Sequence, residues 1–269
     1  MSAMNPILKR ILTALVTAAV VAGLLIWLPR SVNPERVLVP LLILVAGAVH
    51  LEFSQMVARK HPILVGPGVA VGMIYLFSVS YAYSGLLPVL FFVLAMLTLF
   101  GPTQKPIATL ATTVLGFVYV PWMLRELVWF AQASTGSAWW LLLYVVALVK
   151  VSDMGGFAFG VAFGRHKMCP TVSPKKSWEG MAGSVFASCV VSLAFKPLTG
   201  YSLPASLCFG VVAAVTGTLG DLVESRFKRA CEVKDSGTFM PAGMGGLLDM
   251  FDSLVFAPAA LHLAMGFVG

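Results

Sequence analysis

Long apolar runs separated by short polar segments make up most of this chain. Nine runs are long enough to be read as membrane spans, and charged residues, prolines and glycines mark their ends. The predicted spans cover about residues 11–28, 37–57, 63–82, 86–100, 106–124, 138–163, 180–196, 203–226 and 246–267. The third and fourth runs are separated by a short turn at Ser84–Pro88, so eight spans are an alternative. This pattern predicts an all-α, polytopic membrane protein.

Composition and charge agree with this fold class. Of the 269 residues, 59% are hydrophobic and 11% are charged, which is too little charge to cover a soluble protein of this length. With nine spans, thirteen Lys and Arg residues fall on the side of the N-terminus and four on the other side, while Lys150 lies inside a span. The positive-inside rule then predicts a protein of the cell (inner) membrane whose N-terminus and charged loops are cytoplasmic.

Polar residues concentrate in the second half of the chain. Residues 1–137 are predicted to be scaffold spans, and residues 138–269 a catalytic region with cytoplasmic loops at 164–179 and 226–245. Glu52 is a carboxylate deep in the scaffold half. A packing role and a place in a polar cavity are equally compatible with it.

Two predicted spans carry acidic residues between Gly217 and Ser253. Asp221 and Glu224 are spaced i, i+3, as are Asp249 and Asp252, so each pair shares one helix face. An unpaired carboxylate in lipid costs about 2.5–3.5 kcal/mol, which favours a polar cavity between these helices. Because Asp221 and Asp249 lie on different helices, they are predicted to share a divalent ion. Oxygen ligands without a His or Cys cluster favour magnesium or manganese.

A basic loop follows Asp153, a carboxylate that lies inside a predicted span before several glycines. Those glycines are explained by close helix packing. The loop reads SPKKS at Ser173–Ser177, and such a loop can simply mark the cytoplasmic side or attract anionic lipid. The alternative is a phosphate clamp, with lysines supplying charge and hydroxyls donating hydrogen bonds. Its members would be Ser173, Lys175, Lys176 and Ser177.

Gly245 and Gly246 open the last span, where free backbone N–H groups can bind an anion. Carboxylates for a metal together with lysines, serines and glycine amides for phosphates suit phosphoryl or nucleotidyl transfer. The sequence contains no G-x-x-x-x-G-K-[ST] loop, which excludes a P-loop enzyme.

At these residues the chain resembles the phosphatidate cytidylyltransferases, also called CDP-diacylglycerol synthases. The family motifs S-x-x-K-R, K-D-x-G, P-G-H-G-G and L-D-R-x-D stand here as Ser225–Arg229, Lys234–Gly237, Pro241 with Gly245–Gly246, and Leu248–Asp252. Three further blocks resemble S-P-x-K-T-W-x-G, D-S-G-A-Y and E-W, namely Ser173–Gly180, Asp153–Phe157 and Glu52–Phe53. Methionines stand at 154, 244 and 250 where the family has Ser or Thr, His and Arg.

The resemblance implies that CTP and phosphatidic acid react to give CDP-diacylglycerol and pyrophosphate. It implies Mg²⁺ on Asp221 and Asp249, with room for a second cation, and Asp153 and Asp252 supporting the site. The residues expected to hold phosphates are Lys228, Ser173, Lys175, Lys176, Ser177, Ser225, Arg229, Gly245 and Gly246. A lipid bilayer and a second copy of the chain in a homodimer are the other implied partners, and no nucleic acid is expected.

Three other functions stay open from the residues alone. A CTP-dependent lipid-alcohol kinase of the polyprenol type would transfer the γ-phosphate and release CDP. A cation-coupled transporter would use Asp153, Asp221 and Asp249 as an ion relay, although no inverted repeat is evident. A catalytically inactive scaffold would have no need of Asp221, Lys228 and Asp249.

Overall fold

A computed structural model describes residues 35–80, 86–101, 103–134, 140–237 and 246–268 of the chain. The first predicted span, at about 11–28, lies outside the described residues. So do Pro241, Met244 and Gly245 from the predicted site.

Helices make up nearly all of the described structure. Their bounds are α2 Glu35–Ala58, α3 Val65–Ser80, α4 Leu86–Phe100, α5 Pro106–Phe117, the π-helical η1 Val118–Trp122, α6 Met123–Ala133, α7 Leu141–Phe163, α8 Trp178–Ala194, α9 Lys196–Thr199, α10 Leu203–Ala230 and α11 Leu247–Val268. Two short strands, β1 (Lys167–Cys169) and β2 (Ser173–Ser177), pair antiparallel within the predicted 164–179 loop. The mainly helical fold is confirmed, whereas the hairpin was not predicted.

Among the described residues, five helical segments are long and apolar enough to cross a membrane. These segments are Arg36–Ala58, Pro106–Ala133, Leu141–Phe163, Leu203–Ala230 and Leu247–Val268. Helices α3, α4 and α8 are apolar but shorter, at 16, 15 and 17 residues. These findings support a membrane protein, while the total of nine spans stays a prediction.

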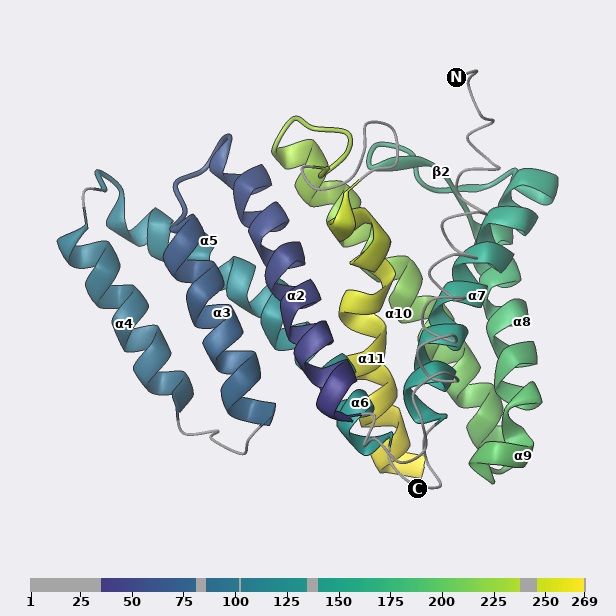
Figure 1. Cartoon of the computed structure of the whole chain (residues 1–269). Coiled ribbons are helices and arrows are strands. Elements are labelled where there is room, and N and C mark those ends of the chain that lie inside the picture. The colour runs from purple at the N-terminus through teal and green to yellow at the C-terminus, as the bar shows by residue number, and fades with distance from the viewer. Residues whose placement is uncertain (1–34, 81–85, 102, 135–139, 238–245, 269) are drawn as a thin grey trace, which may run out of the picture.

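Helices α2 and α11 pack against each other in the middle of the molecule, although they come from opposite ends of the described chain (Figure 1). Helices α3, α4 and α5 extend to one side of this pair, and α7, α8 and α10 to the other. The β1–β2 hairpin, the end of α10 and the start of α11 all lie at the same end of the molecule. The fold therefore brings the basic loop and the two acidic stretches to one place.

Glycines on α7 let this helix pack directly against α8. A Cβ added at Gly155 would lie 2.5 Å from the Cβ of Ala187 and 2.6 Å from the backbone oxygen of Gly183. Real side chains do not approach so closely, so α7 and α8 would have to move apart. The close packing predicted from the small residues is confirmed, and it fixes the position of α7, the helix that carries Asp153.

Replacing Gly155 with alanine should lower the free energy of unfolding by about 1–3 kcal/mol, because an added methyl group overpacks this contact. Gly160→Ala is the matched control, since its Cβ would come no closer than 3.5 Å to Ser177 Oγ. Both variants gain the same helix propensity. Thermal unfolding of the two proteins in the same detergent would compare them. Equal melting temperatures would contradict the packing argument.

Candidate active site

Three carboxylates gather where α10 and α11 cross. Asp221 and Glu224 project from α10 and Asp252 from α11, with one oxygen of each within 4.8 Å of the others. Gly220 permits this approach, because a Cβ there would lie 2.6 Å from the backbone oxygen of Asp252. Ionised carboxylates so close together repel each other unless a cation lies among them. Oxygen donors at this spacing fit a hard divalent cation such as Mg²⁺.

Asp249 lies beside this acidic group but is paired with a lysine. Lys228 Nζ lies 2.6 Å from Asp249 Oδ1 and 2.6 Å from Glu224 Oε2. The Glu224 side chain is fully buried, so this lysine supplies the charge that burial of a carboxylate requires. Asp221 and Asp249, the predicted metal pair, thus belong to neighbouring subsites. For Asp249 to bind the same ion as Asp221, its contact with Lys228 would first have to break.

Glu224 was not among the predicted metal ligands. Its i, i+3 spacing from Asp221 places it on the same helix face, and this spacing is the signal that could have identified it. Only the fold shows that this face of α10 meets Asp252 of α11.

Glu52 reaches the start of α11 from α2. Its Oε2 accepts a 2.7 Å hydrogen bond from the backbone N–H of Leu248, 196 positions away in the sequence. Carboxylates are stabilised at helix N-termini by the free N–H groups and the helix dipole. Gly246 leaves room for this contact, since a Cβ there would lie 2.7 Å from Glu52 Oε1. Glu52 therefore helps to hold the first turn of α11, from which Asp249 and Asp252 project.

The backbone N–H of Gly246, predicted to bind an anion, donates to Asp249 Oδ2 instead. The backbone N–H of Ser236 donates to the same oxygen at 3.3 Å. These contacts orient the Asp249 carboxylate toward Lys228.

The hairpin carries one lysine of the SPKKS segment to the acidic group. Lys176 Nζ lies 2.8 Å from Asp221 Oδ2 and donates at 2.8 Å to the backbone oxygen of Thr218. Lys175 is exposed, as expected for the neighbouring residue in a strand. The structure thus joins two parts of the predicted site that are far apart in the sequence.

The predicted hydroxyl ligands lie in different surroundings. Ser225 Oγ donates to Asp221 Oδ1 at 3.3 Å, and Ser173 is partly buried at the start of β2. Ser177 Oγ accepts from the backbone N–H of Gly180 at 3.1 Å and so caps the N-terminus of α8. A serine just before an apolar helix is the usual signal for such a cap.

The predicted ligand Arg229 is exposed on the last turn of α10. Its Nη1 donates to the backbone oxygen of Val233 at 3.4 Å. It therefore lies at the rim of the site rather than among the carboxylates.

A further polar group joins α7 to α11. Ser253 Oγ donates to Asp153 Oδ2 at 2.8 Å. Lys150 Nζ donates to the backbone oxygen of Met250 at 2.7 Å and to Ser253 Oγ at 3.2 Å, and it lies 3.8 Å from Asp153 Oδ2. Lys150, which lies inside a predicted span, therefore contacts polar groups of the site.

Aromatic rings hold the helices of the site together. The ring of Tyr119 lies 5.1 Å from that of Phe53, 5.0 Å from Phe227 and 5.8 Å from Phe256. These rings come from η1, α2, α10 and α11, so the cluster fixes how the helices that carry the carboxylates face each other.

The charged side chains around the site leave negative charge uncompensated. Its acids are Asp153, Asp221, Glu224, Asp249 and Asp252, and its bases are Lys150, Lys176 and Lys228. In their ionised forms, five carboxylates face three ammonium groups in these contacts, which favours a cation at the site.

Comparison with known proteins identifies relatives of this chain. The cytidylyltransferase family matches residues 8–268. The phosphatidate cytidylyltransferase of Mycobacterium bovis is 36% identical over 162 residues, which cover 59% of this chain and 51% of the relative. The Staphylococcus aureus protein of the same name is 40% identical over 126 residues, covering 46% of this chain and 48% of the relative. The chain spans about half the length of the curated relatives it matches.

Proposed function

This chain belongs to the cytidylyltransferase family, and on that premise we propose that it makes CDP-diacylglycerol and pyrophosphate from CTP and phosphatidic acid. The matching relatives carry the name of that activity. The observation that carries the proposal is the 2.8 Å contact between Lys176 and Asp221. It puts a lysine suited to phosphate beside carboxylates suited to a metal, as nucleotidyl transfer requires.

Mg²⁺ is the proposed cofactor, held by Asp221 with Glu224 and Asp252, and by Asp249 if Lys228 moves away. When bound, it neutralises phosphate charge and polarises the phosphorus–oxygen bonds. The carboxylates fit this role because their oxygens converge within 4.8 Å. A second cation, which the resemblance allows, belongs to the same proposal.

The reaction we propose is an in-line displacement at the α-phosphorus of CTP. A phosphate oxygen of phosphatidic acid forms the new bond, and the bond from the α-phosphorus to the oxygen that bridges to the β-phosphorus breaks. Pyrophosphate leaves with the electron pair. The lipid phosphate is already an anion near neutral pH, so no side chain has to remove a proton.

Lysines assist this step by binding phosphate oxygens. Lys176 compensates Asp221 in the structure, and we propose that its ammonium group turns to a phosphate when CTP binds. Lys228 keeps Glu224 and Asp249 compensated until the substrates arrive. The other proposed phosphate contacts are Ser173, Lys175, Ser177, Ser225, Arg229, Gly245 and Gly246.

The site lies at one end of helices long enough to cross a membrane (Figure 1). The diacyl tails of the substrate can therefore stay in lipid while its phosphate meets CTP at the surface. We propose that this surface is the cytoplasmic face of the inner membrane, because the basic loops gather there. The homodimer belongs to the proposal through the resemblance alone.

Labelled CTP tests this function directly. Purified protein would be incubated with Mg²⁺, phosphatidic acid and CTP that is labelled at either the α- or the γ-phosphate. We expect label from the α-position in lipid and release of pyrophosphate. Label from the γ-position in a lipid alcohol would instead establish the kinase, and no transfer by the folded protein would reject both enzymes.

A further inference from the structure

Helix α11 carries two acids of the candidate site but no lysine or arginine. Asp249 and Asp252 lie in its first two turns, and the whole of Leu247–Val268 contains no strongly basic residue. The side-chain cations next to these acids therefore come from other helices. Lys228 of α10 is one of them, 2.6 Å from Asp249 Oδ1.

Lys150 of α7 reaches α11 from another helix. Its side chain is only 12% exposed, and a lysine inside an apolar helix is costly unless acceptors surround it. Lys150 Nζ donates to the backbone oxygen of Met250 at 2.7 Å and to Ser253 Oγ at 3.2 Å. It also lies 3.8 Å from Asp153 Oδ2. All these contacts are with groups of the candidate site or its immediate neighbours.

Ser253 links this lysine to two carboxylates. Its hydroxyl accepts from Lys150 and donates to Asp153 Oδ2 at 2.8 Å. Its backbone N–H donates to Asp252 Oδ1, and the residue is fully buried. Lys150 therefore helps to fix α11 at the point where Asp252 meets the acids of α10.

Residue 250 is where this chain departs from the motif L-D-R-x-D. A methionine replaces the arginine between the two acids, so the first turn of α11 lacks a cation of its own. The backbone oxygen of the same residue accepts the hydrogen bond from Lys150 Nζ. An ammonium group from α7 thus lies beside the position at which the motif has a cationic residue.

We propose that Lys150 is a positioning residue, and that it supplies from α7 the positive charge that α11 lacks at position 250. It acts through Ser253 and Asp153 rather than on a substrate, because its donors are directed to these groups and to the α11 backbone. The kinetic part of this inference rests on the proposed function. The compensation of charge does not depend on it.

Removing the charge of Lys150 is the first step of the test. Lys150→Gln keeps hydrogen-bond donors but is neutral. We expect kcat for transfer from α-labelled CTP to fall by about tenfold, the difference between a charge-assisted and a neutral hydrogen bond. KM for CTP should stay nearly unchanged, because Lys176 and Lys228 are still present. Lys150→Arg, which keeps the charge, should retain most of the activity.

Returning the charge at residue 250 is the second step. Met250→Arg, added to Lys150→Gln, should restore most of the lost kcat, because a cation again lies at the first turn of α11. Unfolding of this double variant would show whether it is folded.

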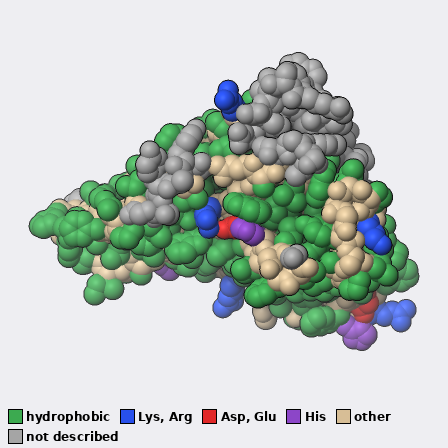
Figure 2. Space-filling view, turned by 90° about the horizontal axis from the view of Figure 1, so that it is seen from below, with side chains coloured by type: hydrophobic (Ala, Val, Ile, Leu, Met, Phe, Trp, Pro, Cys, Tyr) green, Lys and Arg blue, Asp and Glu red, His purple; other side chains and the backbone are tan. Residues whose placement is uncertain are grey.

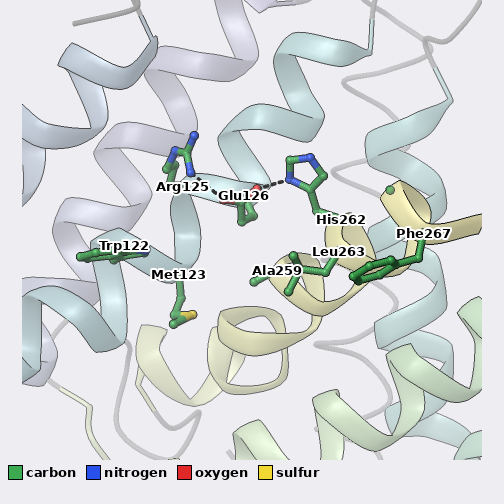
Figure 3. Close-up of a pocket in the computed structure, with 9 residues that line it drawn as sticks. Trp122, Met123, Arg125, Glu126, Ala259, His262, Leu263 and Phe267 are labelled. Carbon is green, nitrogen blue, oxygen red and sulfur yellow. Dashed lines mark hydrogen bonds and ion pairs between the residues drawn. The ribbon is translucent and has the colours of Figure 1, made fainter. Parts of the chain in front are cut away.

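Phe267→Arg in the same Lys150→Gln background is the matched control. Phe267 is 88% exposed and lines a separate cavity at the other end of α11 (Figure 3). It follows Met250 by 17 residues (267 against 250), about 25 Å at 1.5 Å per residue. Hydrophobic side chains predominate on the face at that end, and charged ones are few (Figure 2). An arginine there adds the same charge to the same helix but should restore nothing.

Thermal unfolding in detergent, without CTP or metal, provides a readout that needs no activity. Lys150→Gln should melt about 2–4 °C lower than the unmodified protein, as expected when one ion pair is lost from a chain of this size. Met250→Arg should recover part of this shift, and Phe267→Arg should not.

Three results would overturn the proposal. The first is an unchanged kcat and melting temperature in Lys150→Gln. The second is no recovery by Met250→Arg in either measurement, and the third is equal recovery by Met250→Arg and Phe267→Arg. If the unmodified protein transfers no label, the proposed reaction is rejected, and the melting temperatures still decide whether residue 250 can carry the charge of Lys150.

Discussion

Replacing Asp221 with asparagine should reduce the proposed cytidylyl transfer by roughly 1,000-fold while the protein stays folded. Asparagine keeps the shape of the side chain but removes the charge that the proposed Mg²⁺ requires, and a metal contributes several kcal/mol to stabilising transferred phosphate. One oxygen of Asp221 also lies within 4.8 Å of an oxygen of Glu224 and of an oxygen of Asp252. Transfer from α-labelled CTP to phosphatidic acid, measured across a Mg²⁺ titration, would show the loss.

Glu232→Gln makes the same chemical change outside the site and serves as the control. Glu232 is exposed and pairs with Lys60 at 2.6 Å, so its replacement should leave turnover unchanged. Melting temperatures of both variants would show that the proteins are folded. Full activity of Asp221→Asn would remove Asp221 from the metal site.

Replacing Lys228 with methionine should lower the free energy of unfolding by about 3–5 kcal/mol. This lysine pairs with the fully buried Glu224 and with Asp249, and removing one partner of a buried ion pair leaves the other charge uncompensated. Denaturant or thermal unfolding in detergent, without metal, would measure the change.

Arg229→Gln is the matched control for Lys228→Met, because it removes the adjacent but exposed cation. It should change stability by less than about 0.5 kcal/mol. Adding Glu224→Gln to Lys228→Met should restore part of the loss, since one unpaired charge is then removed as well. Equal stability of Lys228→Met and the unmodified protein would mean that Lys228 does not stabilise the buried acids.

The helices could be predicted from the sequence with little error. Apolar runs such as 37–57 and 203–226 became α2 and α10, with ends shifted by a few residues. The run predicted at 106–124 continues as helix to Ala133. The hairpin was missed because three- and five-residue strands in a basic loop have almost no hydrophobic pattern.

Most of the charged residues that meet in the candidate site could also be selected from the sequence. Charged residues in apolar helices are costly and therefore stand out, as Asp153, Asp221, Asp249 and Lys228 did. The sequence was less informative about Glu52, because its contact with α11 joins residues 196 positions apart.

The sequence by itself determined the class of fold, the long helices and the charged residues that are candidates for the active site. These depend on composition and on spacing within one helix, where neighbours are known from the helical repeat. Only the tertiary structure decided which charges meet. It placed Lys176 on Asp221, Lys228 between Glu224 and Asp249, and Asp252 with Asp221 and Glu224. Such pairings depend on how each helix is rotated and how closely its glycines let it approach its neighbours, and spacing along a single chain does not specify either quantity.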